Sequence, residues 1–266
     1  MNPKANSRLV VFIVSTGRTG TMALAKHYDR MENIVAAHEP AGSYYFNVLS
    51  NLYRAGWINH WHVASGLSLR RRKLESGPEP SVYIESNPWL HGCVSALDQA
   101  FPAPIFDTRL IHVTRHPASY LTSAINNGSA TALKRLASQL VPFWVMRPRP
   151  RHRACFVAPR YPHHERLLWQ WAEINRHLLE VGEMLGSRYY RVRFEDLFGE
   201  TTALEKLSKW IGVNAVREAG FGEDLPKWNA STQTNLGPYN TWPAELKNTL
   251  DAHCSPLFQT LGYEHS

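Results

Sequence analysis

Short apolar runs alternate along the chain with longer segments whose apolar residues recur at helical spacing. Five runs have the length of buried strands and are bounded by polar or proline residues: Leu9–Val14, Ile34–Ala37, Val82–Ile84, Leu110–Thr114 and Tyr189–Val192. The longest helical pattern covers His164–Leu185. Strands that alternate with helices are typical of a parallel sheet with crossover helices. The pattern therefore predicts an α/β fold with a central, mostly parallel β-sheet flanked by helices.

Four further segments are expected to be helical: Thr21–Arg30, Pro88–Ala100, Pro117–Asn126 and a closing helix from about Pro243 to Leu261. Pro88 and Pro117 suit a first helical turn, where a missing N–H costs nothing. Two stretches interrupt the alternation. Residues 57–80 contain the sequence RRRK and end in SGPEP, so we expect a loop-rich insertion, and residues 128–162 form a second insertion of unassigned structure. With 266 residues in total, the chain is predicted to be a single domain over residues 1–266.

The composition is that of a globular protein, with 44% apolar and 19% charged residues. The apolar runs are too short to span a bilayer, and LVVFIV near the N-terminus is not followed by a cleavage pattern, so we expect a cytoplasmic protein without a transmembrane segment. The three widely spaced cysteines, Cys93, Cys155 and Cys254, form neither a disulfide framework nor a zinc pattern.

The formal net charge is +7, and basic residues cluster at Arg70–Lys73 and Arg147–Arg153. Such a balance favours anionic partners through long-range attraction. It does not choose between nucleic acid, an anionic cofactor and an acidic membrane, and each cluster is equally well explained as a solvated loop.

The stretch VSTGRTGTMAL, Val14–Leu24, lies where the first strand is expected to turn into a helix. Backbone N–H groups at a helix start favour an anion, and Gly17 and Gly20 let the backbone approach it closely. The remaining donors are four hydroxyls and one forked cation: Ser15, Thr16, Thr19, Thr21 and Arg18. Gly20 is not followed by the lysine of a nucleoside triphosphate loop. The stretch therefore predicts a different phosphate-binding loop, the alternative being a glycine turn without a ligand.

A second strand, turn and helix is expected at LIHVTRHPASYLTSAI, Leu110–Ile125. Arg115 stands at the carboxyl end of the strand, where ligands collect in open α/β sheets. Ser123 lies eight residues later and therefore about two helical turns along roughly the same face. Arg115 and Ser123 are predicted to bind a second phosphate.

These two segments together resemble the sulfotransferases that use 3'-phosphoadenosine 5'-phosphosulfate (PAPS), and among them the carbohydrate or bacterial type more than the phenol type. RTGTM, Arg18–Met22, is similar to the family's loop for the 5'-phosphosulfate, although Met22 replaces a hydroxyl residue. Arg115, Pro117 and Ser123 match the family's 3'-phosphate motif R-x-P-x-x-x-x-x-S. RVRFEDL, Arg191–Leu197, and the final LGYE, Leu261–Glu264, are weaker similarities.

The resemblance implies a nucleotide-kinase-like (P-loop) sulfotransferase fold and transfer of a sulfuryl group from PAPS to a hydroxyl or, less favoured, an amine, with PAP as the product and no metal. Arg18 would stabilise the leaving phosphate. Glu39, in HEP after the second strand, resembles the base of carbohydrate sulfotransferases, and His38 is its rival. If both lay in a strand, these two side chains would point to opposite faces.

The phenol-type enzymes instead place a histidine after the third strand, in a T-H-x-P-like setting. Here YIESNPWLHG has Asn87 near that position, which leaves Glu85 and His91 as weaker candidates for the base. Lys227 and Trp228, together with Asn229, are candidates for contacts to the 3'-phosphate and the adenine. The acceptor is expected to be a carbohydrate or small molecule rather than nucleic acid, and the sequence gives no oligomeric state.

Two other classes of function are weighed against this interpretation. A small-molecule or nucleotide kinase would share the fold and the early loop, and would need an acidic strand end such as Asp107 or Glu85 for magnesium. A basic nucleic-acid-binding protein would use the two arginine clusters, but it leaves the Arg115-to-Ser123 spacing unexplained.

Overall fold

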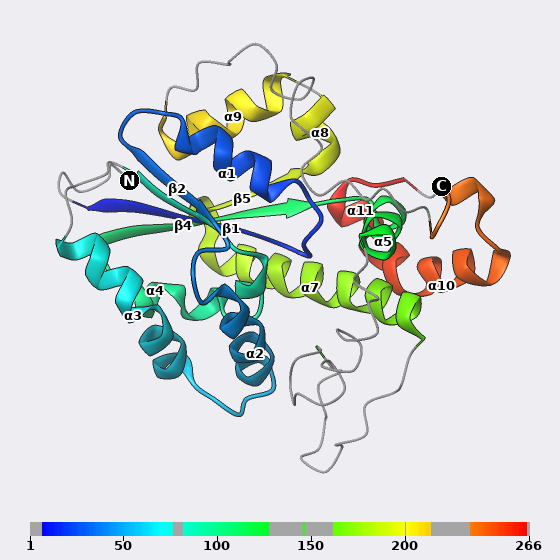
Figure 1. The fold of residues 1–266 in the computed structure, drawn as a ribbon, viewed down its shortest axis with the longest axis horizontal. Helices are drawn as coiled ribbons and strands as arrows, with labels where there is room; N and C mark the ends of the chain where they lie inside the picture. Colours follow the sequence, from blue (N-terminus) through cyan, green and yellow to red (C-terminus); the bar gives the residue numbers. More distant parts are fainter. Residues whose placement is uncertain are drawn as a thin grey trace.

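A five-stranded sheet forms the centre of the computed structural model, which describes residues 7–76, 82–127, 146, 162–199, 201–213 and 235–264. The strand order is β2-β3-β1-β4-β5, and all four neighbouring pairs are parallel. The strands are β1 (Arg8–Ser15), β2 (Ile34–His38), β3 (Val82–Ser86), β4 (Phe106–Thr114) and β5 (Tyr189–Arg193) (Figure 1). Each expected strand is present, so the predicted α/β fold with a parallel central sheet is confirmed.

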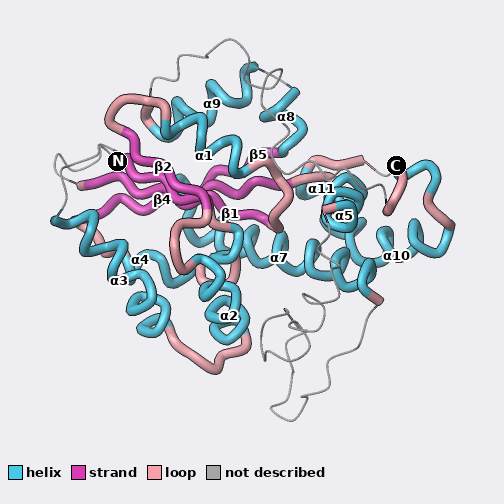
Figure 2. Tube along the Cα trace, in the orientation of Figure 1, coloured by secondary structure: helices cyan, strands magenta, loops and turns pink. Residues whose placement is uncertain are grey.

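Helices cover both faces of the sheet (Figures 1 and 2). One face carries α1 (Thr21–Asp29), α8 (Phe194–Gly199) and α9 (Thr201–Ile211). The other face carries α2 (Ser43–Arg54), α3 (His60–Ser76), α4 (Leu97–Ala100) and α7 (His163–Leu185). Beyond the carboxyl end of β4 lie α5 (Pro117–Asn126), α10 (Ala244–Cys254) and α11 (Phe258–Leu261).

The central strand β1 is buried on both faces. Val10, Phe12 and Val14 pack in one apolar cluster with side chains of α2, α3, α4 and α7. Val11 and Ile13 pack in another with side chains of α1 and α9. A strand that is covered on both faces has no solvent-facing positions. This burial explains why the sequence of β1 is an unbroken apolar run and does not alternate.

Two of the expected helices are interrupted. The segment Pro88–Ala100 forms two short 3-10 turns before α4, because Ser50 of α2 donates to the Trp89 carbonyl (2.6 Å) and accepts from the Gly92 N–H (3.3 Å). Those backbone groups are no longer available to a continuous helix. The closing helix is divided between α10 and α11, and Pro256 lies in the turn between them. The expected helices at α1, α5 and α7 are confirmed to within one residue.

The expectation that residues 57–80 are loop-rich is wrong, because most of them form α3. Val63, Leu67 and Leu74 are its buried residues, and they pack in the cluster beneath the sheet. Apart from Met146 and Pro162, the expected insertion at residues 128–162 lies outside the described residues.

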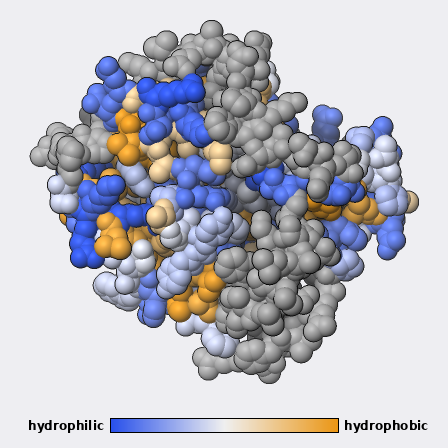
Figure 3. Space-filling view, viewed as in Figure 1, coloured by the Kyte–Doolittle hydropathy of each residue, from blue (hydrophilic) through white to orange (hydrophobic). Residues whose placement is uncertain are grey.

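The described surface is mainly hydrophilic on the face in Figure 3, and its apolar side chains form separate patches. Among the helices that the structure describes, none has the length and apolar character that a membrane span needs.

Candidate active site

The phosphate loop, defined here as Ser15–Thr21, connects β1 to α1. Gly17, Arg18 and Gly20 have positive φ angles of 78°, 57° and 70°. Successive N–H groups in such left-handed turns form concave sites for anions. Gly20 is also packed against α8, since a Cβ atom there would lie 2.6 Å from the Phe198 ring. The left-handed backbone of Arg18 costs about 1–2 kcal/mol, so contacts with the surrounding structure must stabilise this conformation.

Arg115 follows β4 directly and lies beside the loop, because Ser15 of β1 is in register with Val113 of β4. The Arg115 Nη1 donates to the Arg18 carbonyl (2.6 Å), and the Arg18 Nε donates to the Ser123 Oγ of α5 (3.3 Å). The structure thus brings together three predicted phosphate-binding residues from three elements. The crossover that leaves β1 runs to β2 on one side of the sheet, and the crossover that leaves the neighbouring β4 runs to β5 on the other side, so this contact lies at a topological switch point.

The electrostatics of the loop favour an anion. Burial lowers the pKa of both Arg18 and Arg115, and the neighbouring Arg18 cation lowers that of Arg115 further, against the opposing effect of Glu195. Two buried donors, the Thr19 Oγ1 and the Arg115 Nε, have no hydrogen-bond partner among the residues that the structure describes. Unpartnered buried donors are costly, and an ion that accepts from them removes that cost. The site therefore fits a phosphate group.

Phe194 and Trp171 contact the guanidinium and the backbone of Arg115. The sequence analysis did not assign these residues to the site. The guanidinium stacks 4.4 Å from the Phe194 ring centroid, and Trp171 Nε1 donates to the Arg115 carbonyl (2.9 Å). Glu195 accepts from the His116 N–H (2.9 Å) and the Tyr263 hydroxyl (3.3 Å). The available signal was the pair of segments RVRFEDL and LGYE, which contain Phe194, Glu195 and Tyr263.

The candidate bases lie after β2, at the same edge of the sheet. The strand ends at His38, and Glu39 has a positive φ of 44° while its N–H donates to the Ser86 carbonyl (2.9 Å). The His38 Nε2 lies 3.8 Å from the Glu39 Oε1. The condition for opposite faces, that both residues lie in a strand, is not met, because β2 ends at His38 and Glu39 has a left-handed backbone. Burial lowers the pKa of His38, with Glu39 opposing this effect and Lys26 adding to it.

The strand order separates the candidate bases from the phosphate loop. β3 lies between β2 and β1, so the two strand ends are roughly 10 Å apart at the usual spacing of neighbouring strands. The end of β3, with Ser86 and Asn87, lies between them.

The weaker candidates for the base are both buried. Glu85 is 0% exposed and accepts from Tyr83 Oη (3.0 Å) and Asn87 Nδ2 (2.9 Å). His91 is buried, its Nδ1 has no hydrogen-bond partner within the described part of the chain, and burial holds its pKa well below the usual range. Neither side chain has the solvent or substrate access that a general base needs.

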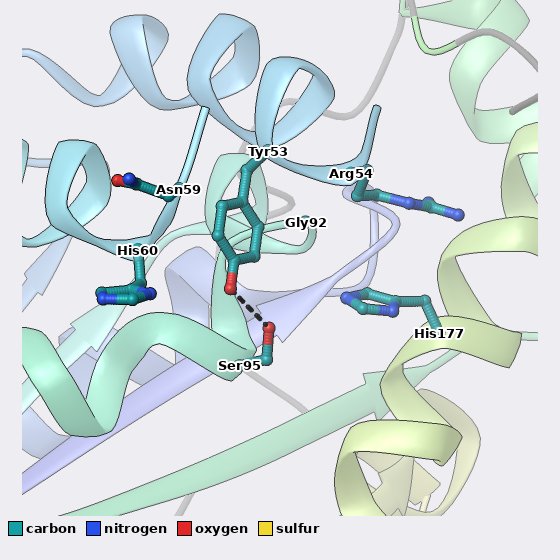
Figure 4. A pocket seen from close by; sticks show the side chains of 7 residues that line it. All are labelled: Tyr53, Arg54, Asn59, His60, Gly92, Ser95 and His177. Atoms are coloured by element: carbon teal, nitrogen blue, oxygen red, sulfur yellow. Dashed lines mark hydrogen bonds between the residues drawn. The ribbon is translucent and has the colours of Figure 1, made fainter. Parts of the chain in front are cut away.

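A pocket of about 400 Å³ lies at the end of α2 (Figure 4). In Figure 4 the Tyr53 ring extends towards Ser95, whose Oγ donates to its hydroxyl (3.4 Å). The described residues that line it are Tyr53, Arg54, Asn59, His60, Gly92, Ser95 and His177. These come from α2, α3, the segment between them, α7 and the segment after β3, so the pocket is separate from the phosphate loop.

A kinase or a nucleic-acid-binding protein would depend on other residues. Those that the structure describes lie away from the phosphate loop or are paired with other side chains. Asp107 lies near the amino end of β4, in register with Leu9, and accepts from Arg109 (2.7 Å). Arg70 of the RRRK cluster lies 3.2 Å from the buried Glu85, and Arg71 pairs with Glu75. Within the described ranges, no group of three His, Cys, Asp or Glu side chains is placed to hold a metal ion. Arg147–Arg153 and the nucleotide candidates Lys227 and Trp228 lie outside the described residues.

No protein-family model and no curated protein matches this chain. Solved structures do match over nearly its whole length. The sulfotransferase domain from the curacin biosynthetic pathway is 12% identical, with a TM-score of 0.56 over 98% of this chain and 100% of that domain. The sulfotransferase domain of the Synechococcus PCC 7002 olefin synthase is 16% identical, with a TM-score of 0.53 over 98% and 97%.

A sulfotransferase from Alicyclobacillus acidocaldarius is 13% identical, with a TM-score of 0.53 over 98% of each chain. At these identities the likeness concerns the fold. The fold expected from the motif resemblance is therefore confirmed, and this chain has the architecture of the sulfotransferase domains.

Proposed function

We propose that this protein is a PAPS-dependent sulfotransferase that transfers a sulfuryl group to a hydroxyl group of a carbohydrate or small-molecule acceptor. The observation that carries the proposal is the convergence of Arg18, Arg115 and Ser123 at the switch point of a sulfotransferase-type sheet. The unpartnered donors of Thr19 and Arg115 support it.

PAPS, when bound, supplies the sulfuryl group and a phosphate leaving group. The phosphate loop, Ser15, Thr16, Gly17, Arg18, Thr19, Gly20 and Thr21, would hold its 5'-phosphosulfate. Arg115 and Ser123 would hold its 3'-phosphate. The Arg115 guanidinium donates to the Arg18 carbonyl and the Arg115 carbonyl accepts from Trp171, and these two contacts would keep the phosphate subsites in a fixed relation.

Three bond changes define the transfer. The acceptor O–H bond breaks, a bond forms from that oxygen to sulfur, and the bond from sulfur to the phosphate oxygen breaks. Arg18 stabilises the negative charge that grows on this phosphate oxygen, and its partial burial strengthens the effect. Glu39 accepts the acceptor proton. His38 is the alternative base, because its lowered pKa keeps it neutral and able to accept a proton at pH 7.

The test is transfer of labelled sulfur from PAPS to a panel of carbohydrates, alcohols and amines. Arg18→Ala should lower the rate about 100-fold, corresponding to the ~3 kcal/mol typical of a lost transition-state donor. Arg72→Ala removes an exposed arginine of α3 and should leave the rate unchanged. Failure to label any acceptor, together with equal rates of PAP release from the wild type and Arg18→Ala, would refute the proposal.

A further inference from the structure

A buried ion pair lies at the carboxyl end of β3. The Arg70 Nε of α3 is 3.2 Å from the Glu85 Oε2, and the Glu85 side chain is 0% exposed. Tyr83 donates to the same carboxylate oxygen and Asn87 to the other. Burial raises the pKa of Glu85, and the Arg70 cation and the two hydrogen bonds lower it. The carboxylate is thus fully engaged, so its role is not that of a base.

The same arginine also contacts the turn Pro40–Ser43, which joins Glu39 to α2. The Arg70 Nη2 donates to the Ala41 carbonyl (3.4 Å) and approaches the Ser43 Oγ (3.5 Å). The guanidinium stacks on Phe46 of α2, 4.7 Å from the ring centroid. A guanidinium has several donors in a fixed plane, so it can bind a carboxylate and a carbonyl at once, whereas an ammonium group is a single point charge.

Asn87 holds the turn from the other side. Its Nδ2 donates to the Ser43 Oγ (3.1 Å) as well as to Glu85, and Ser43 donates to the Pro40 carbonyl (2.6 Å). Glu85 is therefore connected to the turn through both Arg70 and Asn87. Glu39, directly before the turn, and Gly42, within it, both have left-handed backbones, with φ angles of 44° and 83°. Glu39 keeps a backbone conformation that is unfavourable for its residue type only if its surroundings hold it there.

We propose that Arg70 and Glu85 are positioning residues for Glu39. Their ion pair fixes α3 and the turn Pro40–Ser43 to the end of β3, and this fixed turn places the Glu39 carboxylate for proton transfer. The inference rests on the proposed function and adds a role for the RRRK cluster, of which Arg70 is the least exposed member.

Arg70→Lys is the decisive variant, because lysine keeps a positive charge near Glu85 but loses the planar contacts to Ala41 and Phe46. Arg71→Lys is its matched control, since Arg71 is the neighbouring residue and, among the described residues, pairs locally with Glu75 at i+4. Turnover is measured as PAP release from PAPS with water as the acceptor, so that no acceptor needs to be known. Arg70→Lys should lower kcat about tenfold and leave the KM for PAPS unchanged, and Arg71→Lys should change neither.

A double-mutant cycle separates positioning from general stability. If Arg70 acts through Glu39, Arg70→Lys should cause no further loss of kcat in a Glu39→Gln background. Equal loss in both backgrounds would overturn the inference. Glu85→Gln should behave as Arg70→Lys does.

Hydrogen exchange provides a readout that needs no turnover. In Arg70→Lys, exchange of residues 38–46 should accelerate while residues 15–24 stay as protected as in the wild type. Unchanged exchange in residues 38–46 would refute the inference. If the wild-type protein does not bind PAP, the proposed function is refuted instead. Failure of this inference and failure of the proposed function therefore give different results.

Discussion

Individual residues of the phosphate loop are constrained for different physical reasons. Gly17 and Gly20 both have positive φ angles, which disfavour any residue with a Cβ atom. At Gly17 a Cβ would meet nothing within 4 Å, whereas at Gly20 it would meet the rings of Phe198 and Phe194 at 2.6 and 3.0 Å. Gly20 therefore couples the loop to α8, the helix that also supplies the ring beneath Arg115.

Replacing these two glycines separates backbone strain from packing. Gly17→Ala should lower the free energy of unfolding by about 1 kcal/mol, the cost of a left-handed alanine. Gly20→Ala should cost a further ~1–3 kcal/mol, because the aromatic rings must move. Urea denaturation of the two variants measures the difference. Equal midpoints for both would show that the contact with Phe198 carries no cost.

The sequence revealed those site residues whose signal is local. The loop glycines and the Arg115-to-Ser123 spacing follow from one strand, turn and helix each. The contact between Arg18 and Ser123 depends on the pairing of β1 with β4, and the stacking of Phe194 on Arg115 depends on β5 lying next to β4. Such contacts join residues that are distant in the chain, so no local pattern contains them.

On the scale of the elements, one buried histidine of β4, His112, connects this strand to α7 and β5. The His112 Nε2 lies 2.8 Å from the Asn175 Oδ1 of α7, and its Nδ1 lies 2.7 Å from the Tyr189 Oη of β5. Asn175 donates through its Nδ2 to the Trp171 carbonyl, so its Oδ1 is the acceptor and the His112 Nε2 carries the hydrogen. Burial lowers the pKa of His112 to about 3, so the folded protein holds it neutral.

This histidine predicts a loss of stability in acid. Between its folded pKa of about 3 and the ordinary value of 6.5, the unfolded chain binds a proton that the folded chain does not. The free energy of unfolding should therefore fall as the pH decreases below 6.5, with up to about 1.4 kcal/mol per pH unit from His112. Urea denaturation from pH 4 to 8 measures this slope. His112→Gln should have a shallower slope, and an identical slope would contradict the assignment.

Element prediction succeeded where burial on both faces made the apolar signal continuous, as in β1. It failed for α3, where the buried residues Val63, Leu67 and Leu74 are separated by polar and basic positions. The basic cluster suggested a solvated loop because the partner of Arg70, Glu85, lies on β3 and is not visible in the local sequence. A tertiary ion pair of this kind has no counterpart in the local sequence.

On the scale of the whole molecule, the sheet brings the phosphate loop and Arg115 to one switch point and leaves the Glu39 turn two strands away. The net charge of +7 adds long-range attraction for an anionic nucleotide. The likeness to sulfotransferase domains at 12–16% identity supports the fold, and the proposed phosphate-binding constellation of Arg18, Arg115 and Ser123 supports the proposed chemistry. The central claim is therefore that this constellation binds a 3'-phosphorylated nucleotide.

The most direct test is calorimetric titration of the protein with PAP, with and without magnesium, for the wild type and Arg115→Ala. The account predicts micromolar or tighter binding that does not require magnesium and is lost in Arg115→Ala. Arg72→Ala, which removes an exposed arginine, should bind PAP as the wild type does. Absence of PAP binding, together with magnesium-dependent binding of ATP, would contradict the account and favour a kinase.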